Sequence, residues 1–170
     1  MFQMAGASRA HNLIVGNLIG EIRQNLKGRP CCVYPSDLRV RVPAAGLYTY
    51  PDVTVVCGEE EFLDNELDTL LNPTVLIEVL SDSTEQFDRG DKFRHYQSLE
   101  SLRAYVLVSQ HQPNIDLLER LDDGQWKLTP VGGLDGALRI ESIDIAVPLS
   151  EIYSNVEFPP PRDIPGLFKD

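Results

Sequence analysis

Apolar side chains recur at four-residue intervals near the start of the chain, which places them along one face of an α-helix. The repeating positions are Ile14, Leu18, Ile22 and Leu26. This pattern predicts a helix over residues 8–27 with one buried face. Gly28 follows directly and is suited to end the helix, because glycine readily adopts the left-handed conformation found after many helices.

Later segments contain short apolar runs, some alternating with polar residues, which is typical of β-strands. Strands are predicted over residues 31–34, 38–42, 50–56, 74–80, 103–109, 114–121, 125–131 and 138–140. A second helix is predicted over residues 88–99, and a helical turn within residues 148–155. This order of elements predicts an α/β (α+β) fold in which a mixed sheet is flanked by helices.

The length of 170 residues suits one domain with a sizeable core. We expect this domain to cover residues 1–157, followed by a proline-rich tail over residues 158–170. No apolar run approaches the length of a membrane span, and the N-terminus lacks the pattern of a signal peptide. Cys31, Cys32 and Cys57 are odd in number and lack zinc-ligand spacing, so we expect buried thiols in a reducing cytoplasm.

The net charge of −11 argues for weak nonspecific binding to nucleic acid, since that affinity comes mainly from lysine and arginine. The charge is uneven, however. Residues 1–57 carry six basic and three acidic side chains, whereas residues 58–170 carry nine basic and twenty-three acidic ones. Four basic residues of the first part are candidates for contacting phosphates, or are simply solvated. They are Arg23, Lys27, Arg39 and Arg41.

Two predicted strands each contain one carboxylate among apolar residues, Asp52 and Glu78. A carboxylate in such a strand is costly unless it is paired, and a divalent cation is one suitable partner. Strand alternation places Val75, Ile77 and Val79 in the core and points Glu78 toward an opening or a site. The two acids therefore form a candidate magnesium site.

Lys92 and Tyr96 are four residues apart in the second predicted helix, so they share one helical face. From that face the lysine could meet both carboxylates, with Tyr96 as an accessory residue. Two acids, a cation and an amine suit phosphodiester hydrolysis. The cation lowers the pKa of bound water, and the amine orients the water or stabilises developing negative charge.

Structural explanations exist for each of these residues. Asp52 follows a proline and could cap a turn, while Glu78 could form a buried ion pair with an arginine. Lys92 alone would be a surface lysine, and Tyr96 a core residue with a solvated hydroxyl. His11 precedes most of the first predicted helix and is expected to have a capping or packing role.

Taken together, these motifs resemble those of a known family. They are Pro51–Asp52, residues 78–81, residues 88–92 and Tyr96, with further similarity over residues 4–12 and 103–108. The chain resembles the restriction-endonuclease-like proteins of the PD-(D/E)XK nuclease superfamily. This resemblance implies a mixed sheet flanked by helices, bound Mg²⁺ or Mn²⁺, and cleavage of DNA. It assigns metal binding to Asp52 and Glu78, and the catalytic amine to Lys92.

Two departures from the superfamily pattern are evident. The usual lysine stands two residues after the second acid, where this chain has Leu80, so Lys92 on the following helix takes its place. Members usually carry an additional N-terminal segment with another acid, so either the start codon of this chain is mis-assigned or the protein lacks that acid and an edge of its sheet. Glu21 is the nearest acid that could replace it.

The alternative to a metal-dependent endonuclease is a catalytically inactive module of the same fold that acts through protein contacts. The acidic net charge, Leu80 and the short N-terminus favour this alternative. The proline-rich tail and an exposed sheet edge would suit a homodimer. A metal-dependent hydrolase with a substrate other than DNA is a third hypothesis.

Overall fold

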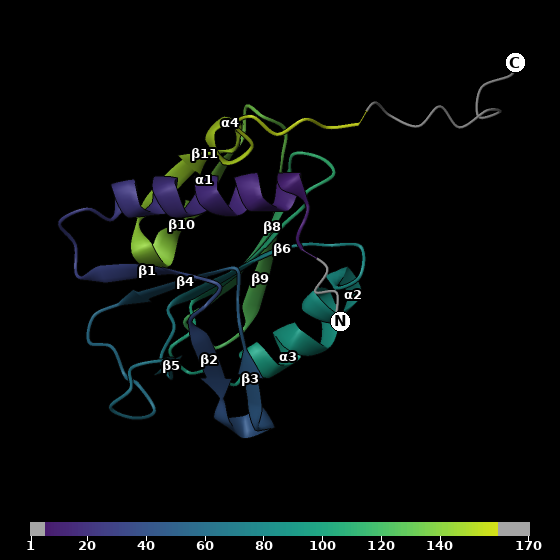
Figure 1. The fold of residues 1–170 in the computed structure, drawn as a ribbon. Coiled ribbons are helices and arrows are strands. Elements are labelled where there is room, and N and C mark those ends of the chain that lie inside the picture. Colours follow the sequence, from purple (N-terminus) through teal and green to yellow (C-terminus); the bar gives the residue numbers. More distant parts are fainter. Residues whose placement is uncertain (1–5, 160–170) are drawn as a thin grey trace, which may run out of the picture.

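The computed structural model describes residues 6–159. Most of the expected proline-rich tail, and the first two residues of the family similarity over residues 4–12, lie outside the described residues. Its centre is a mixed sheet of six strands in the order β1-β4-β6-β7-β8-β9 (Figure 1). The strands are β1 (Cys31–Pro35), β4 (Val53–Cys57), β6 (Val75–Val79), β7 (Ala104–Val108), β8 (Asn114–Arg120) and β9 (Trp126–Gly132). β6 and β7 run parallel, and the other neighbours in this sheet are antiparallel. The expected fold class is therefore confirmed.

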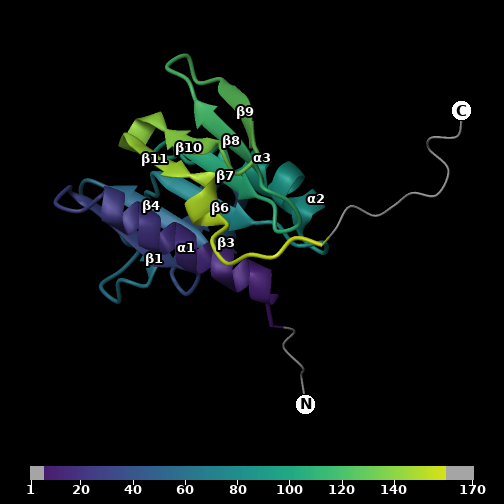
Figure 2. The ribbon, with the colours of Figure 1, turned by 90° about the horizontal axis from the view of Figure 1, so that it is seen from above.

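One face of the sheet is covered by α1 (Arg9–Asn25), which lies over β1, β4 and β6 (Figure 2). The hairpin of β10 (Ala137–Ile140) and β11 (Ile145–Pro148), joined by η3 (Glu141–Ile143), and the short α4 (Leu149–Ile152) complete this layer. The predicted apolar stripe of α1 is fully buried there. Inward-facing residues of β6 join the same cluster, as strand alternation predicts. They are Val75, Ile77 and Val79.

The opposite face is covered by two further units. One is a small sheet in the order β3-β2-β5, made of β2 (Arg39–Val42), β3 (Leu47–Thr49) and β5 (Thr69–Leu70), with η1 (Pro43–Ala45) between β2 and β3. The other is a helical segment of α2 (Glu85–Phe87), the π-helical turn η2 (Asp88–Lys92) and α3 (Phe93–Tyr96). Residues of both units enclose a second core against the outer face of β6 and β7.

Several element boundaries differ from the sequence prediction. The second helix begins at Glu85 and ends at Tyr96, and it contains a π-helical turn that periodicity alone does not indicate. β3, β5 and β11 were not predicted, because each is only two to four residues long, and β5 in addition pairs with β2 about 30 residues earlier. Within residues 6–159, no helix has the length and apolar character needed to cross a bilayer.

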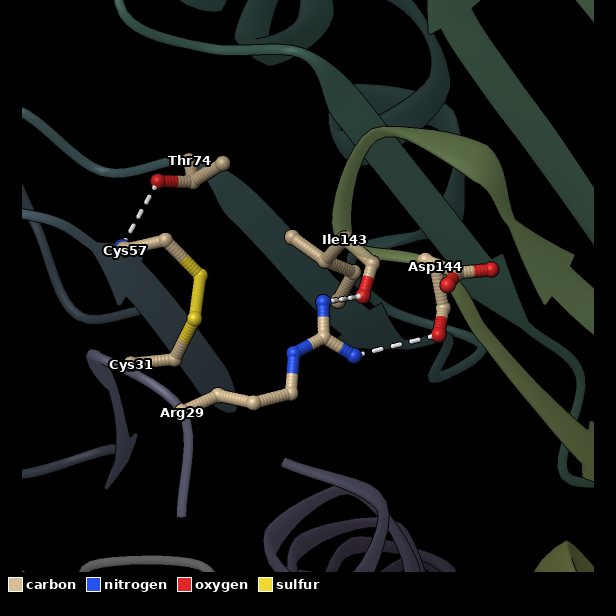
Figure 3. Close-up of a disulfide and its surroundings, with 6 residues drawn as sticks. All are labelled: Arg29, Cys31, Cys57, Thr74, Ile143 and Asp144. Atoms are coloured by element: carbon tan, nitrogen blue, oxygen red, sulfur yellow. Dashed lines mark hydrogen bonds between the residues drawn. A yellow bond between two sulfur atoms is a disulfide. The ribbon is translucent and has the colours of Figure 1, made fainter. Parts of the chain in front are cut away.

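The expectation of three buried thiols is wrong. Cys31 and Cys57 form a disulfide, and Cys32 is exposed (Figure 3). The physical reason is the antiparallel register of β1 and β4, which places Cys31 directly opposite Cys57. Disulfides persist mainly in oxidising compartments, so the cysteines no longer support a reducing one. The cytoplasmic location stays a prediction.

We predict that removing the disulfide with the double substitution Cys31→Ser and Cys57→Ser lowers the free energy of unfolding by roughly 3 kcal/mol, because the bridge closes a loop of intermediate length in the unfolded chain. Cys32→Ser is the matched control and should have little effect. Urea denaturation without reductant measures both. Equal stability of the double variant and the wild type would contradict the disulfide.

Candidate functional site

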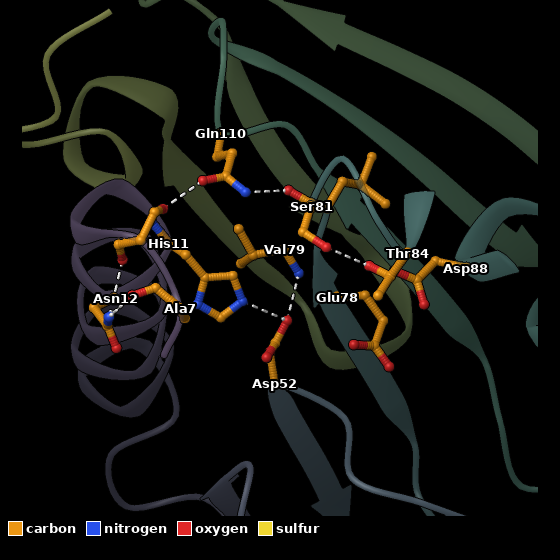
Figure 4. Close-up of polar contacts among 12 residues, drawn as sticks. Ala7, His11, Asn12, Asp52, Glu78, Val79, Ser81, Thr84, Asp88 and Gln110 are labelled. Carbon is orange, nitrogen blue, oxygen red and sulfur yellow. Dashed lines mark hydrogen bonds and ion pairs between the residues drawn. The ribbon is translucent and has the colours of Figure 1, made fainter. Parts of the chain in front are cut away.

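Pairing of β4 with β6 brings the two predicted acids together. In this antiparallel register Val53 lies opposite Ile77. Continuing the register by one residue places Asp52 opposite Glu78, and opposed residues of neighbouring strands have side chains within contact distance. Figure 4 shows Asp52 at the start of β4 and Glu78 on β6. The 26-residue separation in sequence thus becomes a direct cross-strand pair.

Glu78 is enclosed within the second core, so of the two expected alternatives, an opening or a site, it does not face an opening but points into a cluster of polar side chains. Its neighbours on the same strand face, Leu76 and Leu80, are buried, and the Glu78 side chain is only 6% exposed. This burial is the main reason that its pKa rises from 4.5 to about 7. Lys92 opposes the rise in pKa, and the negative charge of Asp52 adds to it.

The partner of Glu78 is Lys92 and not an arginine. The Nζ of Lys92 lies 2.6 Å from Glu78 Oε1 and 3.3 Å from Oδ1 of Asp88, which lies one helical turn before Lys92. The lysine side chain is 12% exposed, so it is not an ordinary surface lysine. Burial lowers the pKa of Lys92, but the adjacent carboxylates outweigh that effect and the pKa is raised. Asp88, itself buried, was not singled out by the sequence.

Tyr96 also reaches this pair. Its hydroxyl oxygen lies 3.0 Å from Thr49 Oγ1, and its proton is donated to Glu78 Oε1 at 3.4 Å. The residue is fully buried, so the expectation of a solvated hydroxyl is wrong, and burial raises its pKa. Lys92 and Tyr96, predicted to share a helical face, both point at Glu78.

Asp52 is held by two donors. Its Oδ2 accepts hydrogen bonds from the backbone N–H of Val79 at 2.8 Å and from His11 Nε2 at 3.2 Å (Figure 4). The hydrogen bond to Asp52 raises the pKa of His11, against the lowering effect of burial. Sequence reasoning missed this contact. The signal was present, because His11 lies on the same helical stripe as Ile14 and Leu18.

The accessory acid Glu21 lies on α1, ten residues after His11. At a rise of 1.5 Å per residue this is about 15 Å along the helix axis. His11 is therefore the α1 side chain that reaches Asp52, and Glu21 is displaced along the helix from that contact.

Of the four candidate phosphate-contacting residues, Arg39 and Arg41 lie on β2, whereas Arg23 lies near the end of α1 and Lys27 just after it. The guanidinium groups of Arg39 and Arg41 lie 5.4 and 5.8 Å from the ring centre of Tyr48. Arg39 also donates to Thr69 Oγ1 at 2.9 Å and pairs with Asp68. This outer face of the small sheet is separate from the contacts around Glu78.

The donor chemistry of the site is compatible with magnesium. Within residues 6–159, no three His, Cys, Asp or Glu side chains converge as a ready-made metal centre. Magnesium, however, is commonly held by one or two carboxylates and completes its shell with water and substrate phosphate. Asp52 and Glu78 supply two such carboxylates, and no described residue donates a hydrogen bond to Asp52 Oδ1.

Comparison with known proteins identifies the family of the chain. The family model Uma2, described as "Putative restriction endonuclease", matches residues 1–148. The uncharacterized Synechocystis proteins slr1290 and sll1609 are 34% and 32% identical, over 93% and 84% of this chain and 82% and 80% of their own lengths.

A crystal structure described as a "putative nuclease belonging to DUF820" from Anabaena variabilis has the same fold. It superposes with a TM-score of 0.73 at 15% identity, over 88% of this chain and 83% of the other. The fold is therefore nuclease-like, and the chain belongs to the Uma2 family of restriction-endonuclease-like proteins.

Proposed function

We propose that this protein is a metal-dependent endonuclease that hydrolyses phosphodiester bonds in DNA. Asp52 and Glu78 are the proposed ligands of Mg²⁺ or Mn²⁺, and Lys92 is the proposed catalytic amine. The observation that carries the proposal is the buried Glu78, whose pKa is about 7 and whose carboxylate meets Lys92 at 2.6 Å. Buried ion pairs contribute little to stability, and such perturbed groups gather at functional sites.

Each residue has a distinct role in this proposal. A bound ion would lower the pKa of a coordinated water and polarise a phosphoryl oxygen. Asp52 and Glu78 supply anionic oxygen ligands. Lys92 offers N–H donors to the attacking water or to the developing negative charge on the phosphate. If Glu78 binds the metal ion, the carboxylate of Asp88 still lies beside the Lys92 amine as its ionic partner.

The proposed contact with DNA involves the outer face of the small sheet. Arg39 and Arg41 stack against Tyr48, which is 46% exposed, and this combination of guanidinium groups and an aromatic ring suits nucleic acid. Asp68 partly neutralises Arg39. Together with the net charge of −11, this supports weak, salt-sensitive DNA binding.

A second candidate function is supported by the burial and ion pairing of the site residues. Asp52, Glu78 and Lys92 are 16%, 6% and 12% exposed, and each already has an ionic partner. These pairs would suit an inactive module that binds other proteins or a second copy of itself. The homodimer remains part of this proposal, and light scattering would test it.

We predict that Asp52→Asn, Glu78→Gln and Lys92→Met each reduce Mg²⁺- or Mn²⁺-dependent cleavage of plasmid DNA by about a hundredfold or more, because each removes a charge proposed to act on the phosphate. Asp91→Asn and Lys127→Met change exposed residues of the same types and serve as controls. Cleavage that persists in both acid variants would refute the assignment. Absence of cleavage by the wild type, with no stabilisation by either metal, would favour the inactive module.

We predict a pH-dependent loss of stability caused by Glu78. Between pH 4.5 and about 7 the folded protein binds more protons at this carboxyl than the unfolded chain does. The free energy of unfolding therefore falls as the pH rises through this window. The wild type should lose stability relative to Glu78→Gln between about pH 5 and about pH 8, measured by urea denaturation in EDTA. Asp91→Asn, whose carboxyl is exposed, should show no such relative change.

We predict that the double substitution Arg39→Ala and Arg41→Ala weakens DNA binding and reduces the slope of log affinity against log salt by about one for each lost phosphate contact. The control is Arg94→Ala with Lys127→Ala, which removes the same charge from exposed positions elsewhere. Fluorescence anisotropy at several salt concentrations measures both. Equal effects in the two double variants would show that only net charge matters.

A further inference from the structure

Asp52 lies just outside β4, so the hydrogen bonds of the strand do not by themselves fix its side chain. Its orientation depends on the two N–H groups that converge on Oδ2, one from Val79 and one from His11. Val79 directly follows Glu78, and this contact therefore ties the Asp52 carboxylate to the backbone beside the other proposed ligand. With Oδ2 held, Oδ1 has no donor among residues 6–159.

Hydrogen bonds fix the backbone of His11 as well as its side chain. Its backbone N–H donates to Oγ of Ser8, the residue that caps α1, at 3.0 Å. Ser8 in turn donates to Gln110, and the Gln110 side-chain amide donates to the carbonyl of Leu80 at 2.7 Å. These bonds join the first turn of α1 to the segment that follows Glu78.

The second ring nitrogen of His11 shows that packing alone does not explain the residue. Nδ1 is buried and has no hydrogen-bond partner within residues 6–159. A buried polar atom without a partner is costly, and an apolar side chain of similar size would avoid that cost. What histidine provides that leucine would not is the Nε2–H donor to Asp52.

We propose that His11 is a positioning residue that orients the Asp52 carboxylate for binding a divalent cation. This inference rests on the proposed function, because it assumes that Asp52 is a metal ligand. His11 does not touch the metal or the DNA in this proposal. It acts through Asp52, as the outer partners of metal-binding side chains commonly do.

The inference is tested by Mn²⁺ titration calorimetry without DNA, at one fixed pH. His11→Leu keeps apolar volume but loses the donor, and we expect its Mn²⁺ affinity to fall roughly tenfold, at the lower end of the usual effect of such partners. His11→Gln keeps an N–H donor of similar reach and should bind within a few-fold of the wild type. His11→Asn is too short to reach and should resemble His11→Leu.

A kinetic measurement separates positioning from a general structural defect. In His11→Leu, the Mn²⁺ concentration for half-maximal cleavage should rise about tenfold, while the rate at saturating Mn²⁺ stays close to that of the wild type. His111→Leu is the matched control. It removes another histidine–aspartate pair, His111 with Asp82 at 2.7 Å, on an exposed surface. This control should leave both quantities unchanged.

The amide resonance of Val79 provides a metal-free measurement. Because Val79 N–H donates to the carboxylate that His11 holds, its proton signal should move and exchange faster in His11→Leu, but not in His11→Gln. Asp52→Ala gives the reference for complete loss of the bond.

The outcomes distinguish this inference from the proposed function. Normal Mn²⁺ binding by His11→Leu, with binding lost in Asp52→Asn, would overturn the role of His11 and leave the metal site intact. Equal weakening in His11→Leu and His11→Gln would also overturn it, because only ring shape would then matter. Normal binding by Asp52→Asn would refute the metal site, and the positioning role with it.

Discussion

The candidate site depends on one costly arrangement, a carboxylate buried inside an apolar core. Glu78 lies between Leu76 and Leu80 on β6, where an apolar residue would pack without penalty. Removing a charge from water costs several kcal/mol, and an ion pair recovers that cost only in part. Lys92 and Tyr96 direct polar hydrogens at the buried carboxylate, but its pKa is still raised to about 7. The fold therefore maintains a charge that stability alone does not require.

The two cores explain how the fold tolerates this arrangement. α1 and the β10–β11 hairpin form an apolar layer on one face of the sheet. The other face is covered by two short units, the β2-β3-β5 sheet and the helical segment from Glu85 to Tyr96. The polar residues lie where these two units meet β6, because Thr49 comes from one unit and Lys92 from the other. Because two separate units cover this face, polar side chains fit between them, in space that the side chains of one continuous helix would occupy.

Sequence reasoning found what local periodicity encodes. It predicted the buried stripe of α1, the inward face of β6, and the pairing of Lys92 and Tyr96 on one face. It missed the Cys31–Cys57 bridge and the His11–Asp52 bond, which depend on the register or packing of distant segments. When the partner of a residue is distant in sequence, the local pattern predicts only a capping, packing or unpaired role for that residue. Asp88 was overlooked for a related reason, since its burial depends on how the helical segment lies on the sheet.

The π-helical turn offers a physical reason for the displaced lysine. Leu80, two residues after Glu78, contributes to the second core, so a lysine there would replace an apolar contact with a buried charge. Lys92, at the end of the π-helical turn, brings the amine to Glu78 from the helical segment that follows β6. Such turns carry an extra residue relative to an α-helix, change the direction of the side chains that follow, and are frequent at functional sites. Asp88, Lys92 and Tyr96 follow one another at four-residue intervals, so Lys92 contacts Asp88, and Lys92 and Tyr96 both reach Glu78 from this segment. A motif along β6 alone does not contain the amine, because it comes from the helical segment that follows the strand.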